Sequence, residues 1–361
     1  MEYAAFKAAT EQAGEALGRG DLSPQLARLW FDGTTVSAWD DNVAISVACP
    51  FEFDGGVLGE LLTKLIGRAT GKEVAVTTKG GTAIFKVGRS SLKLTVEPLE
   101  QRSFEMRDPD RAAAIAVEAK LLKPALGQIL KCVGQSLEKP EYHGITFAVD
   151  GNDLLIYAGQ PQVLAEAAVP LKSKPKSKFN YVVLPEKFCR QLVKHYDEKD
   201  SELTLYNATD TIGGGLLVCP TLTVFGRSLS SGRQKLDMRA YIDSHVKQAP
   251  AWFPIPKGLA GMLDRASLFE GEHHNLELAV EAVSGGVRLR ITIEDGEAQL
   301  VDVSGTIKGE VEPVVVKTNA KHLRTGADLI EMCVDSKRII MRDDQGDDGV
   351  CITQVASVIA V

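Results

Sequence analysis

The residues best suited to metal binding lie in one short stretch, EGEHH, after a helical segment. His273 and His274 could bind a metal ion together with Glu270 and Glu272, because imidazole and carboxylate groups are common zinc ligands. The sequence offers no further ligand at a recognisable spacing, and the stretch falls between a helix signal and a strand signal. We therefore interpret it as a surface loop and predict no metal and no cofactor.

Two other combinations could support catalysis or phosphate binding. Cys189 and His195 are the residue types of a nucleophile and its base, but six residues apart on a helix they face opposite sides. Gly213, Gly214 and Gly215 lie between two strand signals rather than before a helix, which is typical of a hairpin and not of a phosphate loop. The sequence thus gives no support for an enzyme.

Positive charge follows a clearer pattern. In AKLLKPALGQILKCV, residues 119–133, the lysines fall on one face of a helix and the aliphatic residues on the other. Pro124 is compatible with a helix that begins near residue 120. The same phase recurs in later helical segments, so we predict one shared cationic surface. Its predicted residues are Lys64, Arg68, Lys120, Lys123, Lys131, Lys187, Arg190, Lys194, Lys257, Arg265, Lys321 and Arg324.

These cations belong to helices that recur along the chain in pairs. The predicted helices are residues 5–17 with 57–68, 119–134 with 185–196, and 257–268 with 319–331. Each follows an extended segment and precedes alternating strand patterns, and the later pairs repeat with a period of about 135 residues. We therefore predict an α+β protein of three tandem domains, at residues 1–112, 113–248 and 249–361, each with two helices backed by antiparallel sheets.

The overall composition is acidic. The 361 residues have a net charge of -7 and are 44% hydrophobic, which suits two or three domains with real cores. The predicted helices nevertheless contain more lysine and arginine than aspartate and glutamate. If all six helices point the same way, they form a basic inner surface on an acidic body, as a protein that encloses the phosphate backbone needs.

The cysteines and the N-terminal sequence bear on localisation. The six cysteines include no CxxC pair and are interpreted as reduced core residues. The first residues lack a basic region followed by an apolar run, and no apolar stretch is long enough to span a membrane. We expect a cytoplasmic protein without a membrane partner.

Three short motifs point to a family. Gly88–Leu94 (GRSSLKL) is similar to a Gly-[Arg/Lys]-Ser strand, Tyr142–Phe147 (YHGITF) to Leu-Asn-Gly-x-x-Phe, and Asn319 with Leu323 to Asn-x-x-[aromatic]-Leu. In this order and spacing, the chain resembles the three-domain sliding clamps of bacterial and phage replication, the beta subunit family of DNA polymerase III. The resemblance covers essentially the whole chain.

The resemblance implies three DNA-clamp domains per chain and a head-to-tail homodimer, whose ring encircles duplex DNA with its helices lining the hole. It implies a processivity factor without catalysis, whose partners are double-stranded DNA, a DNA polymerase and a clamp loader. Retention by topology agrees with weak, scattered lysines, because many firm phosphate contacts would make binding strongly salt-dependent and would resist sliding.

The resemblance also implies an apolar pocket between the second and third domains, which takes short peptides of polymerases and clamp loaders. The family's Thr-Asp-Gly-His-Arg is replaced here by GQPQV (159–163), and its Met-Pro-Met-Arg-Leu ending by ASVIAV (356–361). We therefore expect a partner motif unlike the usual bacterial one, as in a phage or mobile-element replisome. By position, the pocket residues are Tyr142, Gly159, Leu164, Ile242, Val246, Ala356 and Val358.

Alternatives to a DNA-encircling ring stay open at this point. A cationic helix face is commonly a solvated surface, and an intracellular peptide-binding scaffold of clamp-like fold would keep the pocket without encircling DNA. Trp252, between Pro250 and Pro254, is interpreted as a packed residue of an interdomain linker rather than as a platform for a ligand.

Overall fold

The computed structural model describes residues 1–102, 114–134, 143–175, 179–206, 213–229, 238–269, 275–293, 299–304, 306–344 and 350–357. Its contacts divide the chain into two compact units. Unit 1 contains residues 1–116 and 175–231, and unit 2 contains residues 117–174 and 232–361. Each unit thus joins two segments that are distant in the sequence. The division into three domains at residues 112 and 248 stays a prediction.

Unit 1 contains three α-helices, one short 3-10 helix and antiparallel strands. Its helices are α1 (Tyr3–Gly14), α2 (Gly59–Arg68), η1 (Leu99–Gln101) and α4 (Glu186–His195). Its strands are β1 (Arg28–Asp32), β2 (Thr35–Trp39), β3 (Val43–Ala48), β4 (Asp54–Leu58), β5 (Val74–Lys79), β6 (Thr82–Val87), β7 (Ser90–Thr95), β8 (Ala114–Val117, whose last residue belongs to unit 2), β12 (Tyr181–Leu184), β13 (Glu202–Tyr206), β14 (Gly214–Cys219) and β15 (Leu222–Arg227).

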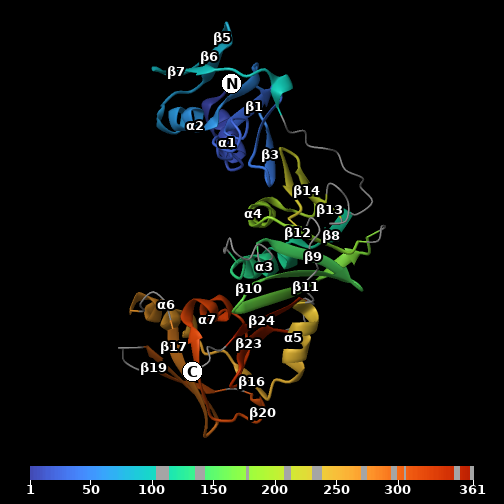
Figure 1. Ribbon diagram of the computed structural model, residues 1–361, viewed down its shortest axis with the longest axis vertical. Coiled ribbons are helices and arrows are strands. Elements are labelled where there is room, and N and C mark those ends of the chain that lie inside the picture. The colour runs from blue at the N-terminus through green and yellow to red at the C-terminus, as the bar shows by residue number, and fades with distance from the viewer. Residues whose placement is uncertain are drawn as a thin grey trace. The chain divides into compact units, whose positions relative to one another are not determined.

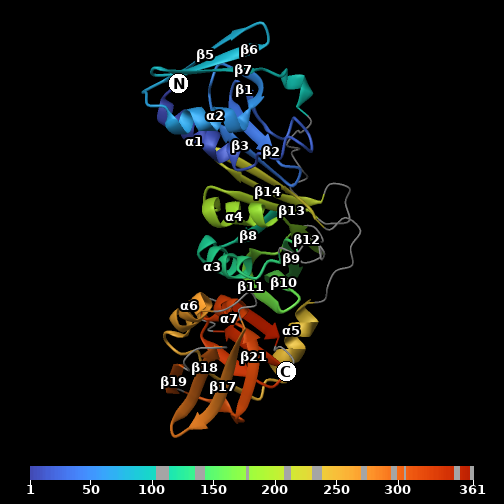
Figure 2. The same cartoon turned by 60° about the vertical axis from the view of Figure 1, so that its left-hand side comes forward.

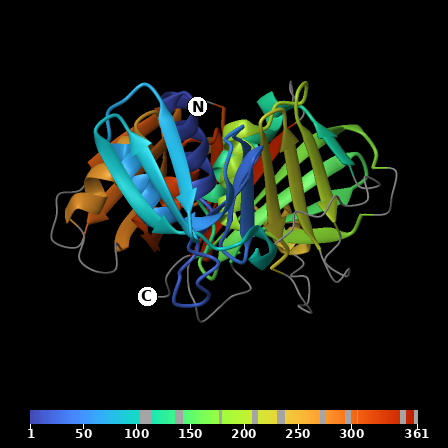
Figure 3. The same ribbon diagram turned by 90° about the horizontal axis from the view of Figure 1, so that it is seen from above.

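One antiparallel ribbon joins the two segments of unit 1. Its strands follow the order β4-β1-β2-β3-β15-β14-β13-β8. The junction is the β3–β15 pair, in which Val224 lies opposite Ile45; Figure 3 shows the blue strands beside the olive ones. Strands β5, β6 and β7 form a separate three-stranded sheet.

Aromatic packing fixes α1 against the strands of unit 1. Phe6 of α1 is fully buried, and its ring centroid lies 4.6 Å from that of Phe51 and 5.9 Å from that of Phe31. Phe53 meets Phe85 edge to face at 5.4 Å. Such pairs contribute about 0.5–1.5 kcal/mol each beyond the burial of their area, so they hold the helix in one place.

Two glycines of the sheet allow helix α4 to pack closely against it. The ring of Phe188 is fully buried against β14 and β15. A Cβ atom at Gly226 would lie 2.7 Å from this ring, and one at Gly215 would lie 2.9 Å from it. Both positions therefore exclude a side chain, and this fixes how closely α4 approaches the sheet.

Unit 2 contains four α-helices and two antiparallel sheets. Its helices are α3 (Ala119–Leu130), α5 (Met238–Lys247), α6 (Leu259–Phe269) and α7 (Ala320–Gly326). Its strands are β9 (Ile145–Asp150), β10 (Asp153–Gln160), β11 (Val163–Ser173), β16 (Ala251–Pro254), β17 (Asn275–Val283), β18 (Gly286–Ile293), β19 (Gln299–Ser304), β20 (Lys308–Gly309), β21 (Val314–Asn319), β22 (Glu331–Val334), β23 (Arg338–Asp343) and β24 (Cys351–Ser357).

The ribbon of unit 2 is built like that of unit 1. Its order is β9-β10-β11-β24-β23-β22-β16-β20, and the β11–β24 pair joins the two distant segments. A second sheet has the order β19-β18-β17-β21. Within this unit, α6 and α7 lie together, whereas α5 lies on the opposite side against β11 and β24 (Figures 1 and 2).

The predicted α+β class is confirmed, and each predicted helix has a counterpart. Helix α3 begins at Ala119, close to the predicted start, and its Leu122, Leu126 and Ile129 are buried. Asn319 is the N-cap of α7, where its side chain accepts a hydrogen bond from the Lys321 N–H at 2.9 Å.

Three features of the predicted elements are wrong. Helix α7 ends at Gly326 rather than at residue 331, and residues 331–334 belong to β22. Helix α6 begins at Leu259, so Lys257 precedes it. Helix α5 was not predicted at all, because the sequence MRAYIDSHVK is mixed in polarity and its strongest apolar pair is Ile242 with Val246.

The cysteines only partly follow the prediction of reduced core residues. All six are free, and Cys49, Cys132, Cys189 and Cys333 are buried. Cys219 is half-buried and Cys351, the first residue of β24, is exposed, so the prediction is wrong for these two. No helix in the described ranges is long and apolar enough to cross a membrane.

Candidate functional site

The candidate catalytic residues are not brought together where the structure describes them. Residues 270–274, including both histidines of the EGEHH stretch, lie outside the described residues. Cys189 is fully buried in α4, and burial raises the pKa of its thiol well above the ordinary value. The Nε2 atom of His195, at the end of the helix, lies 3.1 Å from Nε2 of Gln12 instead. Gly214 and Gly215 are the first residues of strand β14.

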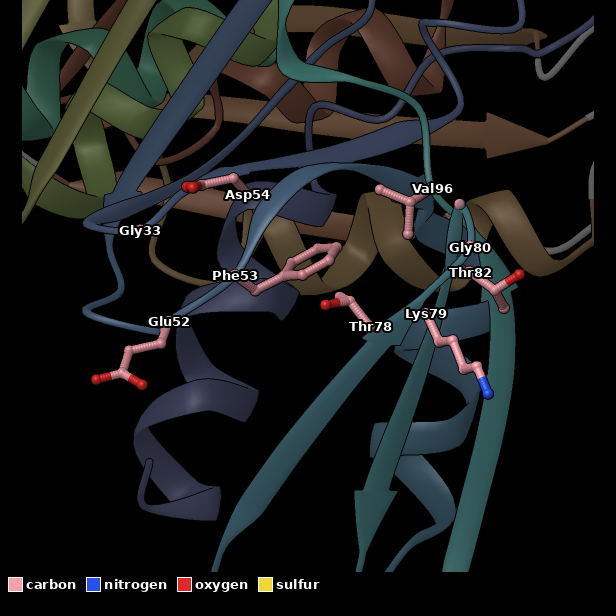
Figure 4. Close-up of a pocket in the computed structure, with 10 residues that line it drawn as sticks. Gly33, Glu52, Phe53, Asp54, Thr78, Lys79, Gly80, Thr82 and Val96 are labelled. Carbon is pink, nitrogen blue, oxygen red and sulfur yellow. The ribbon is translucent and has the colours of Figure 1, made fainter.

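A cleft of about 660 Å³ opens in unit 1 beside the turn between β5 and β6. Figure 4 shows the Phe53 ring directed into it, with Thr78 and Lys79 on the hairpin side. The carboxylates of Glu52 and Asp54 point away from Lys79, so the cleft does not assemble an acid–base pair. None of the residues predicted for a site lines it.

The predicted cations of unit 1 are exposed or half-buried, and most of them form ion pairs. Lys64 pairs with Glu60 and Arg190 with Glu186, each across one helical turn. Lys187 pairs with Asp40, which follows strand β2. Arg68, the last residue of α2, is exposed and has no ion-pair partner among the described residues.

Lys194 belongs to a junction between α4 and α1. Its Nζ atom donates to Glu15 at 3.0 Å, and the buried Gln191, one turn earlier, donates to the same carboxylate at 2.6 Å. Partial burial raises the pKa of Glu15, but the hydrogen bonds from Lys194 and Gln191 outweigh it, so the pKa lies below its ordinary value. The carboxylate is therefore held in its charged form at neutral pH.

Lys131 belongs to a similar junction between α3 and α7 in unit 2. Its Nζ atom donates to Asp328 at 3.1 Å and to the side chain of Gln128 at 2.9 Å. Gln128, which is 7% exposed, donates to the backbone carbonyl of Thr325. Partial burial raises the pKa of Asp328, but hydrogen bonds from Lys131 and Arg324 lower it overall.

A buried amide completes this second junction. Gln354 of β24 is fully buried and donates to the carbonyl of His322 at 2.9 Å and to Oγ1 of Thr325 at 2.6 Å. Burial lowers the pKa of His322, so its imidazole tends to stay neutral. In unit 2, the Asp328 carboxylate together with backbone, hydroxyl and amide groups therefore shares the contacts that a single carboxylate makes in unit 1.

The remaining predicted cations of unit 2 differ in their partners. Lys120 pairs with Glu118 at 3.1 Å, and Arg324 pairs with Asp264 at 2.8 Å. Arg265 is exposed on α6. Lys123 is half-buried on α3, whereas Lys257 and Lys321 are exposed, and none of these three lysine ammonium groups has an ion-pair partner in the described part of the chain.

Three of the predicted pocket residues lie together in one apolar cluster. Ile242 of α5 is 2% exposed, and Val246 and Leu164 pack against the same cluster. Its other members are Trp252, Cys333, Ile340 and Val355, with Ala249 packed against it. Helix α5, which the sequence did not reveal, is thus the element that brings Ile242 and Val246 to the sheet.

Strand register decides which of the other predicted pocket residues face this cluster. Gly159 lies opposite Leu164, and a Cβ atom there would meet the Leu164 side chain at 2.2 Å. On β24, Val355 belongs to the cluster, so the buried Ala356 faces the other side of the strand. Val355, rather than the predicted Ala356, therefore faces the cluster. Tyr142 and Val358 lie outside the described residues.

Trp252 is a packed residue, as predicted, and a guanidinium group that belongs to a chain of ion pairs lies over its ring. It is 8% exposed, and the Arg342 guanidinium lies 3.8 Å from the centre of its ring. Arg342 also donates to Glu331 at 3.1 Å, which pairs with Lys308 at 2.7 Å. Partial burial raises the pKa of Glu331, but these two cations lower it overall.

The known proteins that this chain resembles in sequence and in fold are bacterial beta sliding clamps. No protein-family model matches the chain. In sequence it is similar to the beta sliding clamp of Staphylococcus epidermidis, with 22% identity over 186 residues, which are 48% of this chain and 48% of that protein. The chain therefore matches its curated relatives over about half of their length.

The similarity to solved structures covers the whole chain. The DNA polymerase sliding clamp of Bacillus subtilis has a TM-score of 0.81 at 16% identity, over 100% of this chain and 98% of that one. The beta subunit from DNA polymerase of Streptococcus pyogenes has a TM-score of 0.81 at 12% identity, over 100% and 99%. The Helicobacter pylori beta clamp bound to a DNA ligase peptide has a TM-score of 0.79 at 14% identity, over 100% and 99%.

The chain has the fold of a bacterial beta sliding clamp. The resemblance predicted from GRSSLKL, YHGITF and the Asn319 motif is therefore confirmed. Within this clamp fold, the sequence missed α5 and the two helix junctions. A signal for the junctions was present, since a glutamine precedes a lysine by three residues both at the C-terminal end of α3 and in α4.

Proposed function

We propose that the protein is a DNA sliding clamp, a processivity factor without catalytic activity that tethers a replicative DNA polymerase. Two copies form a head-to-tail ring of six clamp domains, with domain boundaries near residues 112 and 248, and the ring encircles duplex DNA. The observation that supports this proposal most strongly is the similarity in fold, which extends over all of this chain and 98–99% of the solved clamps.

The charge distribution is compatible with a ring that slides. A protein with six to ten firm phosphate contacts loses roughly 10³–10⁵ in affinity between 50 and 200 mM salt. A ring that holds DNA by topology does not need such contacts, and here many helix cations are already paired with carboxylates. The proposed clamp works in the cytoplasm on double-stranded DNA, together with a polymerase and a clamp loader.

The apolar cluster of unit 2 supports a site for partner peptides. Leu164, Ile242 and Val246 supply aliphatic side chains, and Trp252 supplies a large aromatic surface. Aromatic and aliphatic groups of this kind form the centres of many peptide-binding sites. We propose that short apolar peptides of the polymerase and the loader bind here, after the side chains of α5 have made room for them.

Retention on DNA tests the ring. The protein is mixed with nicked circular plasmid, a bacterial clamp-loader complex and ATP, and then passed through a gel-filtration column. It should elute with the circular plasmid and be released when the plasmid is cut once. Equal loss from circular and linear DNA would contradict topological binding and would favour a peptide-binding scaffold that does not encircle DNA.

Peptide binding requires a separate test. Leu164→Asp places a charge in the apolar cluster, and it should abolish stimulation of the polymerase without changing the native mass of the ring. Lys172→Asp, on the same strand but away from the cluster, is the matched control. Normal stimulation with Leu164→Asp would contradict the peptide site while leaving the proposal of a ring intact.

A further inference from the structure

The two helix junctions share a short sequence pattern. Gln128 precedes Lys131 at the C-terminal end of α3, and Gln191 precedes Lys194 in α4; in both cases two aliphatic residues separate the glutamine from the lysine. Both glutamines are nearly fully buried, at 7% and 3% exposure. A buried amide on a surface helix is costly unless it is hydrogen-bonded, and the NH2 group of each glutamine donates such a bond, although Oε1 of Gln191 has no partner in the described part of the chain. We therefore interpret both positions as specific contacts.

The contacts of the two patterns correspond. In unit 1, Gln191 and Lys194 both donate to Glu15, at the C-terminal end of α1. In unit 2, Gln128 donates to the Thr325 carbonyl and Lys131 to Asp328, at the C-terminal end of α7 and just beyond it. In each case the buried amide and the lysine one turn later attach their helix to the end of a helix from the distant segment.

We propose that these two Gln-x-x-Lys sequences are junction clasps, and that Lys131 and Lys194 serve the junctions instead of contacting DNA. The phosphate contacts then fall to those predicted cations that have no ion-pair partner among the described residues, namely Arg68, Lys123, Lys257 and Lys321. This assignment rests on the proposed function as a DNA clamp. It gives two different roles to six of the twelve residues of a cationic surface that the sequence presents as uniform.

The physical reason is that an ion pair offers little net charge to a phosphate. Lys194 lies 3.0 Å from Glu15, so a phosphate that approaches it meets a nearly neutral pair and also the repulsion of the carboxylate. A cation without a partner has its full charge available and displaces a condensed counterion when it contacts DNA. Each such contact contributes about 0.9 to the slope of log K against log salt concentration.

Helix α3 supplies a matched pair of variants for the test. Lys123→Met and Lys131→Met remove one charge each and keep most of the aliphatic side chain. Binding of a short fluorescein-labelled duplex to the full chain is measured by anisotropy over a series of NaCl concentrations. Lys123→Met should reduce the slope by up to about 0.9, whereas Lys131→Met should leave it unchanged.

A second variant tests the assignment from the opposite direction. Glu15→Gln keeps an acceptor for Gln191 but removes the negative charge that neutralises Lys194. Once freed, Lys194 can contact a phosphate, so the slope should become steeper by up to about 0.9. This variant gains DNA contact, so a loss of stability cannot imitate the expected result.

The outcomes distinguish a failure of the clasp assignment from a failure of the proposed clamp function. If the wild-type protein binds with a measurable slope and Lys131→Met lowers it as much as Lys123→Met, the clasp assignment is wrong and the clamp function stands. An unchanged or shallower slope for Glu15→Gln would also show that the clasp assignment is wrong while the clamp function stands. If the wild-type chain neither binds duplex nor stays on circular plasmid, the proposed function itself fails.

Discussion

The α1–α4 junction of unit 1 and the α3–α7 junction of unit 2 use the same two side chains but different acceptors. In unit 1, the glutamine and the lysine converge on one carboxylate, that of Glu15. In unit 2, the contacts are divided among the Thr325 carbonyl, the Asp328 carboxylate and the buried Gln354. One junction therefore depends on a single charged group, whereas the other depends on a network.

Because of this difference, we expect the stability of the two junctions to depend on pH in different ways. Protonation of the carboxylate shared in unit 1 removes its ion pair with Lys194, although the neutral carboxyl group can still accept a hydrogen bond from Gln191. The network of unit 2 also contains a carboxylate, that of Asp328, but most of its contacts are made by amide, hydroxyl and backbone groups that do not titrate. The imidazole of His322 lies beside this network, and burial lowers its pKa. The two halves of the protein should therefore weaken under different conditions, and the following variants test that expectation.

Phe188→Ala should have the largest effect and should be confined to unit 1. Its ring is fully buried and fills the space that Gly215 and Gly226 leave free, so its loss creates a cavity under α4. Substitutions of this kind cost about 3–5 kcal/mol. Urea unfolding measures the loss, and hydrogen exchange should increase in α4 and α1 but not in α7. Faster exchange in all three helices would contradict the independence of the two junctions.

Gln354→Leu should weaken the junction of unit 2 by about 1–3 kcal/mol, because it removes two hydrogen bonds, one to the His322 carbonyl and one to Oγ1 of Thr325, although the Thr325 hydroxyl still donates to that carbonyl. Gln191→Leu is the matched change in unit 1. It should cost less, since Lys194 still donates to Glu15 after the amide is removed. Thermal unfolding of both variants gives the comparison, and a larger loss for Gln191→Leu would reverse the proposed order of the two junctions.

The sequence predicted the helices and their cationic faces from local periodicity. Spacing alone places Lys120 and Lys123 on α3, Lys131 at its C-terminal end, and Asn319 at the start of α7. Periodicity cannot show which carboxylate lies opposite a lysine, since that depends on contacts between distant segments. Lys187 and Asp40 are separated by 147 positions, and Lys194 and Glu15 by 179. A pattern that looked like a uniform basic surface therefore turned out to be largely paired.

The apolar pocket illustrates a second limit. Position along the sequence identified Leu164, Ile242 and Val246, which the structure brings into one cluster. Ala356 does not belong to this cluster, because a shift of one residue along a strand moves a side chain to the other face of the sheet. Val355, its neighbour, occupies the cluster. Register of this kind depends on the pairing of β24 with β11 and β23, which no local pattern reveals.

Acidification should weaken the two junctions in different pH ranges. His322 has a lowered pKa in the folded protein, so its contribution to stability is lost as the pH falls below its ordinary value of about 6.5. Glu15 also has a lowered pKa, but for a carboxyl the contribution is complete above about 4.5 and is lost as the pH falls through the lower folded value.

Hydrogen exchange at a series of pH values checks these ranges. Between pH 7 and 5, exchange should increase in α7 and not in α1, and His322→Gln should abolish this change. Below about pH 4.5, α1 and α4 should follow, and Glu15→Gln should remove that second step. Loosening of α1 above pH 5 would show that groups other than Glu15 control the junction of unit 1.

The smallest effects should come from the exposed ion pairs of the two clasps. Exposed pairs contribute about 0.2–1 kcal/mol, and double-mutant cycles can resolve them. The coupling of Lys194 with Glu15 should exceed that of Lys131 with Asp328, because Arg324 lies 3.2 Å from Asp328 and still pairs with it when Lys131 is removed. Both couplings should shrink at 1 M salt, where the screening length is about 3 Å. If Lys131 and Asp328 prove the more strongly coupled pair, Arg324 does not share the charge of Asp328, and the network interpretation of unit 2 loses one of its links.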